Sequence, residues 1–304
     1  MSQIINDAEQ DIAVWQQIVC RIQQCDQEAV STALEAAGAV SVTYQDAGDQ
    51  PVLEPLPGET PLWDDIILTG LFAEDCNVAA ILFSLKDHPD WQLKSLHTEI
   101  LKNQNWERVW MKDFHPMQFG NNLWIYPSWA DIPNDDSVKI LLDPGLAFGT
   151  GTHPTTALCL EWLDKHPPQA KSMIDYGCGS GILAIAAAKL GASSIQATDI
   201  DAQALLATCD NMQRNNISPQ TIQCYLPEQL PKQAVDLVMA NILSGPLVEL
   251  SDTLLNLLKP KGYLVLSGIL ASQTDAIIQA YSDQLSQLQV QQSGDWIRIS
   301  GQKR

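Results

Sequence analysis

The chain lacks several features that would place it in a common protein class. No apolar run reaches the roughly 20 residues of a membrane span, and residues 1–7 lack the basic and apolar regions of a secretory signal. Seven cysteines form no C-x-x-C pair, and none of the five histidines pairs at metal-ligand spacing. These absences argue against a membrane protein, a disulfide framework and a metal site, and we expect a cytoplasmic protein with reduced thiols.

Positive charge is also scarce. The 36 acidic and 17 basic residues give a formal net charge of −19. Residues 1–131 hold 20 acidic and 6 basic residues, a balance of −14, whereas residues 132–304 hold 16 and 11, a balance of −5. Acidic surfaces repel phosphate backbones and attract basic proteins. We therefore expect no direct nucleic-acid binding and a basic protein partner, although acidity that only aids solubility fits these counts equally well.

The pattern of apolar residues predicts two domains. A length of 304 residues with 45% hydrophobic content is sufficient for two cores. A β-α-β-β-α-β order predicts a small ferredoxin-like α+β domain over residues 1–103. Residues 104–131 are predicted to form a linker that includes a short helix at 106–112 and a strand at 123–126. Over residues 132–304 strands and helices alternate, which predicts a parallel sheet with helices on both faces, closed by an antiparallel hairpin. The elements expected in the first domain are strands at 13–22, 40–44, 66–72 and 93–101 and helices at 26–37 and 78–85.

The most specific motif is D-x-G-x-G-x-G, which begins at Asp175 and follows a short apolar stretch. The motif predicts a strand, a tight glycine turn and the start of a helix. This is the arrangement in which an open α/β sheet binds a nucleotide-like ligand. A dinucleotide fingerprint would need glycine at position 182, which is Ile182. Asp199 closes the next apolar strand, where its carboxylate can accept both hydroxyls of a ribose. The pattern resembles that of class I S-adenosylmethionine-dependent methyltransferases; a purely structural turn is the alternative.

Two further segments are candidates for the chemistry. Residues 143–156 contain three glycines, four threonines and His153 in one stretch before an apolar helix. Such a loop is costly to order, which favours ligand binding over a plain connection. Asn241 follows the strand predicted at 235–240, at the sheet edge where open α/β folds bind ligands. Its side-chain oxygen can hold an acceptor amine, or the residue can cap the next helix. His153 is a candidate proton acceptor or a loop-ordering residue.

With these segments the chain resembles the bacterial ribosomal protein L11 methyltransferase family (PrmA). The resemblance implies a Rossmann-like class I domain with a seven-stranded, mostly parallel sheet and an N-terminal substrate-recognition domain. It implies S-adenosylmethionine bound against Thr156, Gly177, Asp199 and Asn241, with no metal and no assigned catalytic residue. The implied reaction is methylation of lysine or N-terminal amines of the large-subunit protein L11. The stretches that carry the resemblance are 54–60, 115–117, 142–156, 174–183, 199–201 and 241–246.

Two other functions compete with this interpretation. Adenine and glutamine N-methyltransferases use N-P-P followed by tyrosine or phenylalanine, whose ring packs on the base or amide. In this chain Asn241 is followed by Ile242 and Leu243, so that ring is missing. The second alternative is a non-catalytic cofactor sensor whose N-terminal domain is the effector. Transfer of a labelled methyl group to a ribosomal protein separates the enzyme from the sensor.

Overall fold

The computed structural model describes residues 14–48, 50, 61–88, 90–102, 115–143, 151 and 153–304. The chain divides into two compact units, residues 1–109 and 110–304. None of the helices within these described ranges is long and apolar enough to cross a membrane. All seven cysteines carry free thiols.

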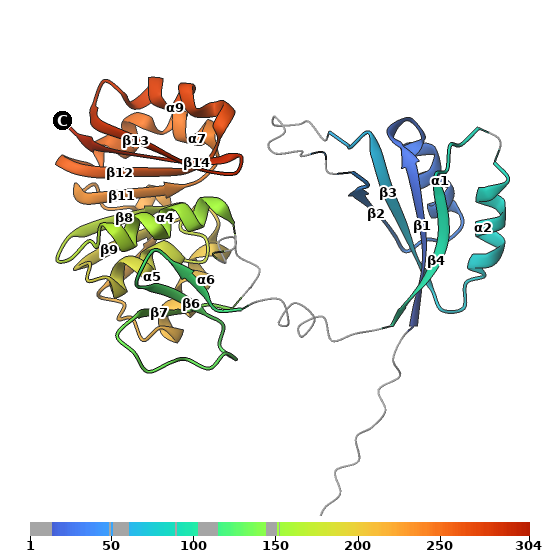
Figure 1. Cartoon of the computed structure of the whole chain (residues 1–304), viewed down its shortest axis with the longest axis horizontal. Coiled ribbons are helices and arrows are strands. Elements are labelled where there is room, and N and C mark those ends of the chain that lie inside the picture. The colour runs from blue at the N-terminus through green and yellow to red at the C-terminus, as the bar shows by residue number, and fades with distance from the viewer. Residues whose placement is uncertain are drawn as a thin grey trace, which may run out of the picture. The chain divides into compact units, whose positions relative to one another are not determined.

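The first unit contains an antiparallel four-stranded sheet in the order β2-β3-β1-β4 (Figure 1). The strands and helices follow one another in the predicted β-α-β-β-α-β order. Both helices pack on one face of the sheet, because their buried side chains share a single apolar cluster with β1 and β3. The elements are β1 (Val14–Gln23), α1 (Gln27–Ala36), β2 (Ser41–Asp46), β3 (Asp65–Ala73), α2 (Val78–Lys86) and β4 (Ser95–Lys102).

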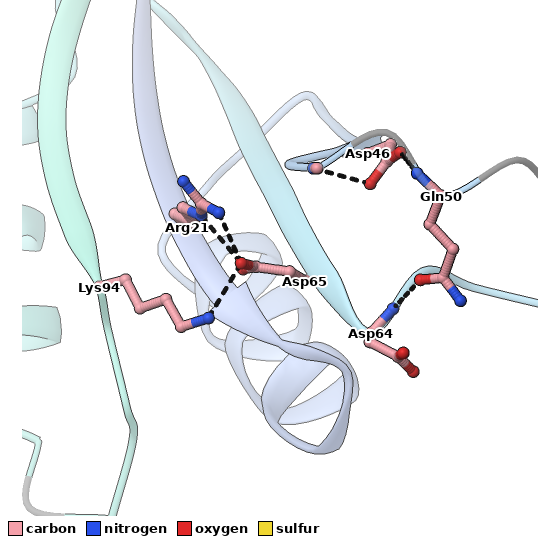
Figure 2. A network of polar contacts seen from close by, with 7 residues as sticks. Arg21, Asp46, Gln50, Asp64, Asp65 and Lys94 are labelled. Carbon is pink, nitrogen blue, oxygen red and sulfur yellow. Dashed lines mark hydrogen bonds and ion pairs between the residues drawn. The ribbon is translucent and has the colours of Figure 1, made fainter.

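A polar network on this unit joins β3, β1 and the start of β4, which are neighbours in the sheet (Figure 2). Asp65, the first residue of β3, accepts hydrogen bonds from the Arg21 guanidinium of β1 at 2.6 and 3.1 Å. The Lys94 ammonium, one residue before β4, lies 2.9 Å from the same carboxylate oxygen. Hydrogen bonds from Arg21 and Lys94 lower the pKa of Asp65 to about 2. Exposed ion pairs add little stability, so the network mainly aligns the strand ends.

The second unit is built on a seven-stranded sheet within the described ranges, in the order β10-β9-β8-β11-β12-β14-β13. Among these described strands, β14 alone runs opposite to the other six, as expected for a mostly parallel sheet closed by an antiparallel hairpin. The strands are β8 (Ser172–Tyr176), β9 (Ser194–Thr198), β10 (Ile222–Tyr225), β11 (Val235–Asn241), β12 (Leu258–Leu270), β13 (Leu285–Ser293) and β14 (Trp296–Lys303). The helices are α4 (Pro154–Lys165), α5 (Ile182–Lys189), α6 (Ala202–Arg214), α7 (Ser244–Glu249), α8 (Ser251–Asn256) and α9 (Thr274–Tyr281).

Helices cover both faces of this sheet. Successive residues of a strand point to opposite faces. In β8, Met173 joins a core with α4, α5 and α6, whereas Ile174 joins a second core with α7, α8 and α9. In β11, Met239 belongs to the core with α4, α5 and α6, and Val238 belongs to the core with α7, α8 and α9. Both faces of the central strands are therefore buried, which explains their nearly continuous apolar runs.

The linker predicted at 104–131 differs from the structure. Residues 115–131 belong to the second unit, where β6 (Leu123–Tyr126) pairs with β5 (Met117–Phe119) and with β7 (Val138–Leu141) in a small three-stranded sheet. Leu123 and Ile125 are fully buried in the same core as α4 and α5. The four residues of β6 do not identify its partner strand, because β7 begins twelve residues after β6 ends. The helix predicted at 106–112 and the stretch 54–60 lie outside the described residues.

Candidate functional site

The candidate site lies where the strand order reverses, between β8 and β11. In open α/β sheets a crevice forms at this point, outside the carboxyl ends of the strands. A cavity of about 450 Å³ opens there. Its lining includes all four residues expected to contact the cofactor, which come from α4 and from the ends of β8, β9 and β11: Thr156, Gly177, Asp199 and Asn241. Of the loop that precedes α4, residues 144–150 and 152 lie outside the described residues.

The glycine turn after β8 has the backbone that its sequence requires. Gly177, Gly179 and Gly181 have φ values of 77°, 53° and 77°, a left-handed region that other residues rarely adopt. A Cβ at Gly177 would also lie 2.2 Å from the Ile242 Cγ2 atom. The chain can therefore make this turn, and the segment after β11 can pack against it, only with glycine at position 177.

The Asp199 carboxylate is held in place by two backbone amides. Its Oδ2 atom accepts a hydrogen bond from Gly179 N at 2.9 Å, and its Oδ1 atom accepts one from Asp201 N at 3.0 Å. Each carboxylate oxygen can accept a further bond. Asp199 thus offers two fixed acceptors to the cavity, the arrangement that a pair of ribose hydroxyls needs.

Helix α6 contributes two buried polar residues that the sequence patterns did not single out. Thr208 Oγ1 donates to the Gly179 carbonyl at 3.0 Å, and Asn211 Nδ2 donates to the Ser180 carbonyl at 2.9 Å. Positions i and i+3 lie on one helix face, so both side chains reach the same turn. The three-residue spacing of Thr208 and Asn211 shows only that they share a helix face. The sequence of α6 does not indicate that this face contacts the glycine turn.

Asp175, the first residue of the motif, is buried beneath the turn with 1% of its surface exposed. Its Oδ2 atom accepts a hydrogen bond from Ala184 N at 3.0 Å in α5, while Oδ1 has no partner among the described residues. Burial raises the pKa of Asp175 to about 7, and the charge of Asp199 adds to the rise. The side chain supports the turn from below and is not part of the cavity lining.

Replacing Asp175 with asparagine is expected to flatten the dependence of stability on pH. Folding raises the pKa of Asp175, so its proton is kept in the folded state at a pH where the unfolded chain has lost it. This contribution to stability is complete below the unfolded pKa near 3.8 and falls as pH rises through about 7. Between about pH 5 and 8 it should decline by about 3 kcal/mol. Urea unfolding of both proteins at the two pH values measures the difference; equal slopes would contradict a buried, protonated Asp175.

Thr156 and Asn241 meet across 85 positions of sequence. Asn241 Nδ2 donates to Thr156 Oγ1 at 3.2 Å, and Thr156 is fully buried near the start of α4. The Asn241 Oδ1 atom is buried and has no hydrogen-bond partner among the described residues. An unsatisfied buried acceptor is costly and rare, so a ligand donor in the adjoining cavity would complete it.

A second glycine fixes the position of the segment that follows Asn241. Gly268 of β12 has φ of +84°, and a Cβ there would lie 2.2 Å from the Ile242 carbonyl oxygen. Ile242 thus packs closely on Gly177 on one side and on Gly268 on the other. This packing holds the chain directly after Asn241 in one place.

His153 caps α4 in the structure. Its Nδ1 atom accepts a hydrogen bond from Thr155 N at 3.4 Å and lies 2.7 Å from Thr155 Oγ1. Its ring packs edge-on against Trp296 with centroids 4.7 Å apart. Burial lowers the pKa of His153, which favours the neutral imidazole. These contacts favour the loop-ordering role over that of a proton acceptor.

Comparison with known proteins agrees with this geometry. The sequence model of the family described as ribosomal protein L11 methyltransferase (PrmA) matches residues 14–304. The chain belongs to this family. The Sodalis glossinidius ribosomal protein L11 methyltransferase is 52% identical over 287 residues, which cover 93% of this chain and 96% of that protein. The Vibrio cholerae protein of the same name is 51% identical over 292 residues, covering 95% and 99%.

A solved structure shows the same relationship. The ribosomal protein L11 methylase of Lactobacillus delbrueckii subsp. bulgaricus is 34% identical, with a TM-score of 0.57, over 63% of this chain and 100% of that chain. The seven-stranded, mostly parallel sheet described above is the class I methyltransferase architecture that the resemblance implied. This member of the L11 methyltransferase family is therefore a methyltransferase that uses S-adenosylmethionine.

Proposed function

We propose that this chain transfers methyl groups from S-adenosylmethionine to lysine or N-terminal amines of ribosomal protein L11. The observation that carries the proposal is the buried Oδ1 atom of Asn241, without a partner in the described residues, on a residue that lines the same cavity as Gly177 and Asp199. The relatives that match over nearly the whole chain carry the name of this activity.

Four residues form the cofactor site in this proposal. The bound cofactor supplies an electrophilic methyl group on a sulfonium. Asp199 accepts the ribose hydroxyls, because both of its oxygens are oriented by backbone amides. Gly177 and Gly179 line the cavity without side chains, and Thr156 and Asn241 also line it. The fit rests on the fixed carboxylate and on the backbone of these two glycines.

The acceptor amine must be neutral to attack. Deprotonation at pH 7 costs about 4–5 kcal/mol for a lysine with a pKa near 10.4, and about 1 kcal/mol for an α-amine near 7.8. Asp199 is the only carboxylate in the described cavity lining. The rest of the lining is largely apolar and includes Ile182, Leu183, Ile242 and Leu243. Apolar surroundings lower the pKa of an amine, so the cavity itself favours the reactive form.

Asn241 positions this amine. Methyl transfer is an in-line displacement, whose rate depends on the direction of the nitrogen lone pair. An N–H of the amine donates to Asn241 Oδ1, which leaves the lone pair to face the methyl carbon. The bond from Asn241 Nδ2 to Thr156 keeps the amide from rotating, and Gly268 lets the following residue pack without displacement. The protein thus supplies orientation, and the cofactor supplies the reactive group.

The N-terminal domain, residues 1–103, recognises the substrate in this proposal, and the enzyme acts in the cytoplasm. Acidic residues are concentrated before position 132, with a balance of −14. A basic ribosomal protein is attracted to such a surface. The cavity, by contrast, lies wholly in residues of the second unit. Recognition and chemistry are therefore assigned to different parts of the chain.

The direct test incubates the purified full-length chain with methyl-labelled S-adenosylmethionine and purified L11. Mass spectrometry then locates and counts the added methyl groups. A second basic ribosomal protein of similar size is the matched control. We expect label on amines of L11 and none on the control protein. Cofactor binding without transfer to L11 would contradict the proposal and favour the cofactor sensor.

Salt should weaken substrate recognition without weakening cofactor binding. Raising the ionic strength from about 50 to 300 mM shortens the Debye length from roughly 14 to 6 Å and screens exposed charges. We expect kcat/KM for L11 to fall several-fold, whereas affinity for S-adenosylhomocysteine stays within twofold. Initial rates and calorimetric titrations at each salt concentration measure the two quantities. A salt-independent kcat/KM would argue that the acidic residues serve only solubility.

A further inference from the structure

Strand β14 carries buried polar side chains on the face that α4 covers. Ile297 and Ile299 point to the core shared with α7, α8 and α9. The intervening Arg298 points to the opposite face, and so does Ser300. Arg298 is 8% exposed and Ser300 is 3% exposed. An arginine at such a position is unusual, because charged residues are rarely buried unless they are paired.

A second cavity adjoins Arg298. Its volume is about 520 Å³, and it lies between α4 and the β13–β14 hairpin. It shares no residue with the cofactor cavity among those that line either one. Gln291 pairs directly with Arg298 across the hairpin. The polar residues that line this cavity are Glu161, Lys165, His166, Gln289, Gln291 and Arg298.

The Nε atom of Arg298 is buried without an acceptor in the described part of the chain. No hydrogen bond or ion pair joins the guanidinium to another described residue. Burial lowers the pKa of Arg298, the nearby charge of Glu161 acts in the opposite direction, and the guanidinium remains charged. A buried donor without an acceptor destabilises the folded chain. A ligand that brings an acceptor to this cavity would remove that cost.

We propose that this second cavity binds a carboxylate through Arg298 and Lys165. The planar guanidinium matches the two oxygens of a carboxylate, and Lys165 adds a point charge to the lining of the same cavity. Glu161 also lines the cavity, so the three charged side chains give a formal balance of +1. That balance suits a monoanion better than a phosphate dianion. The Gln289 and Gln291 amides offer neutral donors beside it.

The test is a titration of the full-length protein with acetate, followed by the backbone amide resonances of the cavity residues. We expect saturable shifts in the native protein. Arg298→Met, which keeps a similar apolar stem, should weaken binding at least tenfold, and Arg298→Lys should weaken it less. Lys232→Met removes the same charge from an exposed position outside the cavity and should leave binding unchanged.

Several outcomes decide the proposal. Equal binding by the native protein and both Arg298 variants would overturn it, as would the absence of saturable shifts. Tighter binding of inorganic phosphate than of acetate at equal ionic strength would overturn the assignment to a carboxylate. If Arg298→Met does not fold, Arg298→Lys alone carries the comparison. A blocked glutamyl peptide distinguishes the two possible sources of the carboxylate. If the peptide binds more tightly than acetate, the ligand is a peptide side chain; if the two bind equally, the ligand is a free acid. Both results support the site.

Discussion

Asn241→Ala is expected to lower kcat for L11 methylation on the order of 10²–10³-fold, while affinity for S-adenosylhomocysteine changes far less. The amide oxygen is the buried acceptor without a partner in the described residues, so alanine leaves the amine free to rotate away from the methyl carbon. Single-turnover rates with saturating cofactor and L11 measure the loss, and calorimetry measures the affinity. Full turnover with unchanged cofactor affinity would show that Asn241 does not position the amine.

Thr156→Val separates positioning from a general loss of structure. Valine keeps the shape of threonine but removes the hydroxyl that accepts the Asn241 bond at 3.2 Å. We expect a smaller fall in kcat, roughly tenfold, because the Asn241 oxygen is still present but less well oriented. The double variant should be no slower than Asn241→Ala alone, since both changes act on one contact. If the double variant instead lost the product of the two single losses in kcat, the two residues would have separate roles.

Asp199→Asn is expected to weaken S-adenosylhomocysteine binding on the order of 10²-fold. Hydrogen bonds to charged groups contribute about 1.5–3 kcal/mol each, and two ribose hydroxyls share this carboxylate in the proposed site. Asparagine keeps the shape of aspartate but has only one acceptor oxygen. In the native protein each oxygen of Asp199 already accepts one backbone N–H, from Gly179 or from Asp201, so the variant has fewer acceptors left for the ribose. Isothermal titration of the full-length chain measures the change.

Asp201→Asn is the matched control for this experiment. It makes the same chemical change two residues later, at the residue whose side chain caps α6 through Gln203 N at 2.9 Å. Asp201 does not line the described cavity, so the control should bind the cofactor within about threefold of the native protein. An equal loss in both variants would assign the effect to charge in general and not to the ribose contact.

Local spacing was enough to predict the glycine turn and the carboxylate beside it. Residues other than glycine rarely adopt the left-handed conformation that this turn uses three times, and Asp199 follows the next strand, so both signals lie within one β-α-β unit. The alternation of strands and helices likewise predicted the sheet and its two covered faces. The strand predicted at 123–126 matches β6, but it was assigned to a linker together with β5, because the pairing of β6 with β7 is a tertiary contact.

What the sequence by itself determined, then, is the glycine turn, the position of Asp199 and the class of fold. The turn and Asp199 depend on a few consecutive residues, and the class of fold depends on the order of strands and helices along the chain. The tertiary structure decided which side chains meet. It joined Thr156 to Asn241 over 85 positions, brought Thr208 and Asn211 to the turn, and left the buried Nε atom of Arg298 without an acceptor in the described residues. Such contacts depend on how helices and strands pack, and residue spacing within one segment carries no record of that packing.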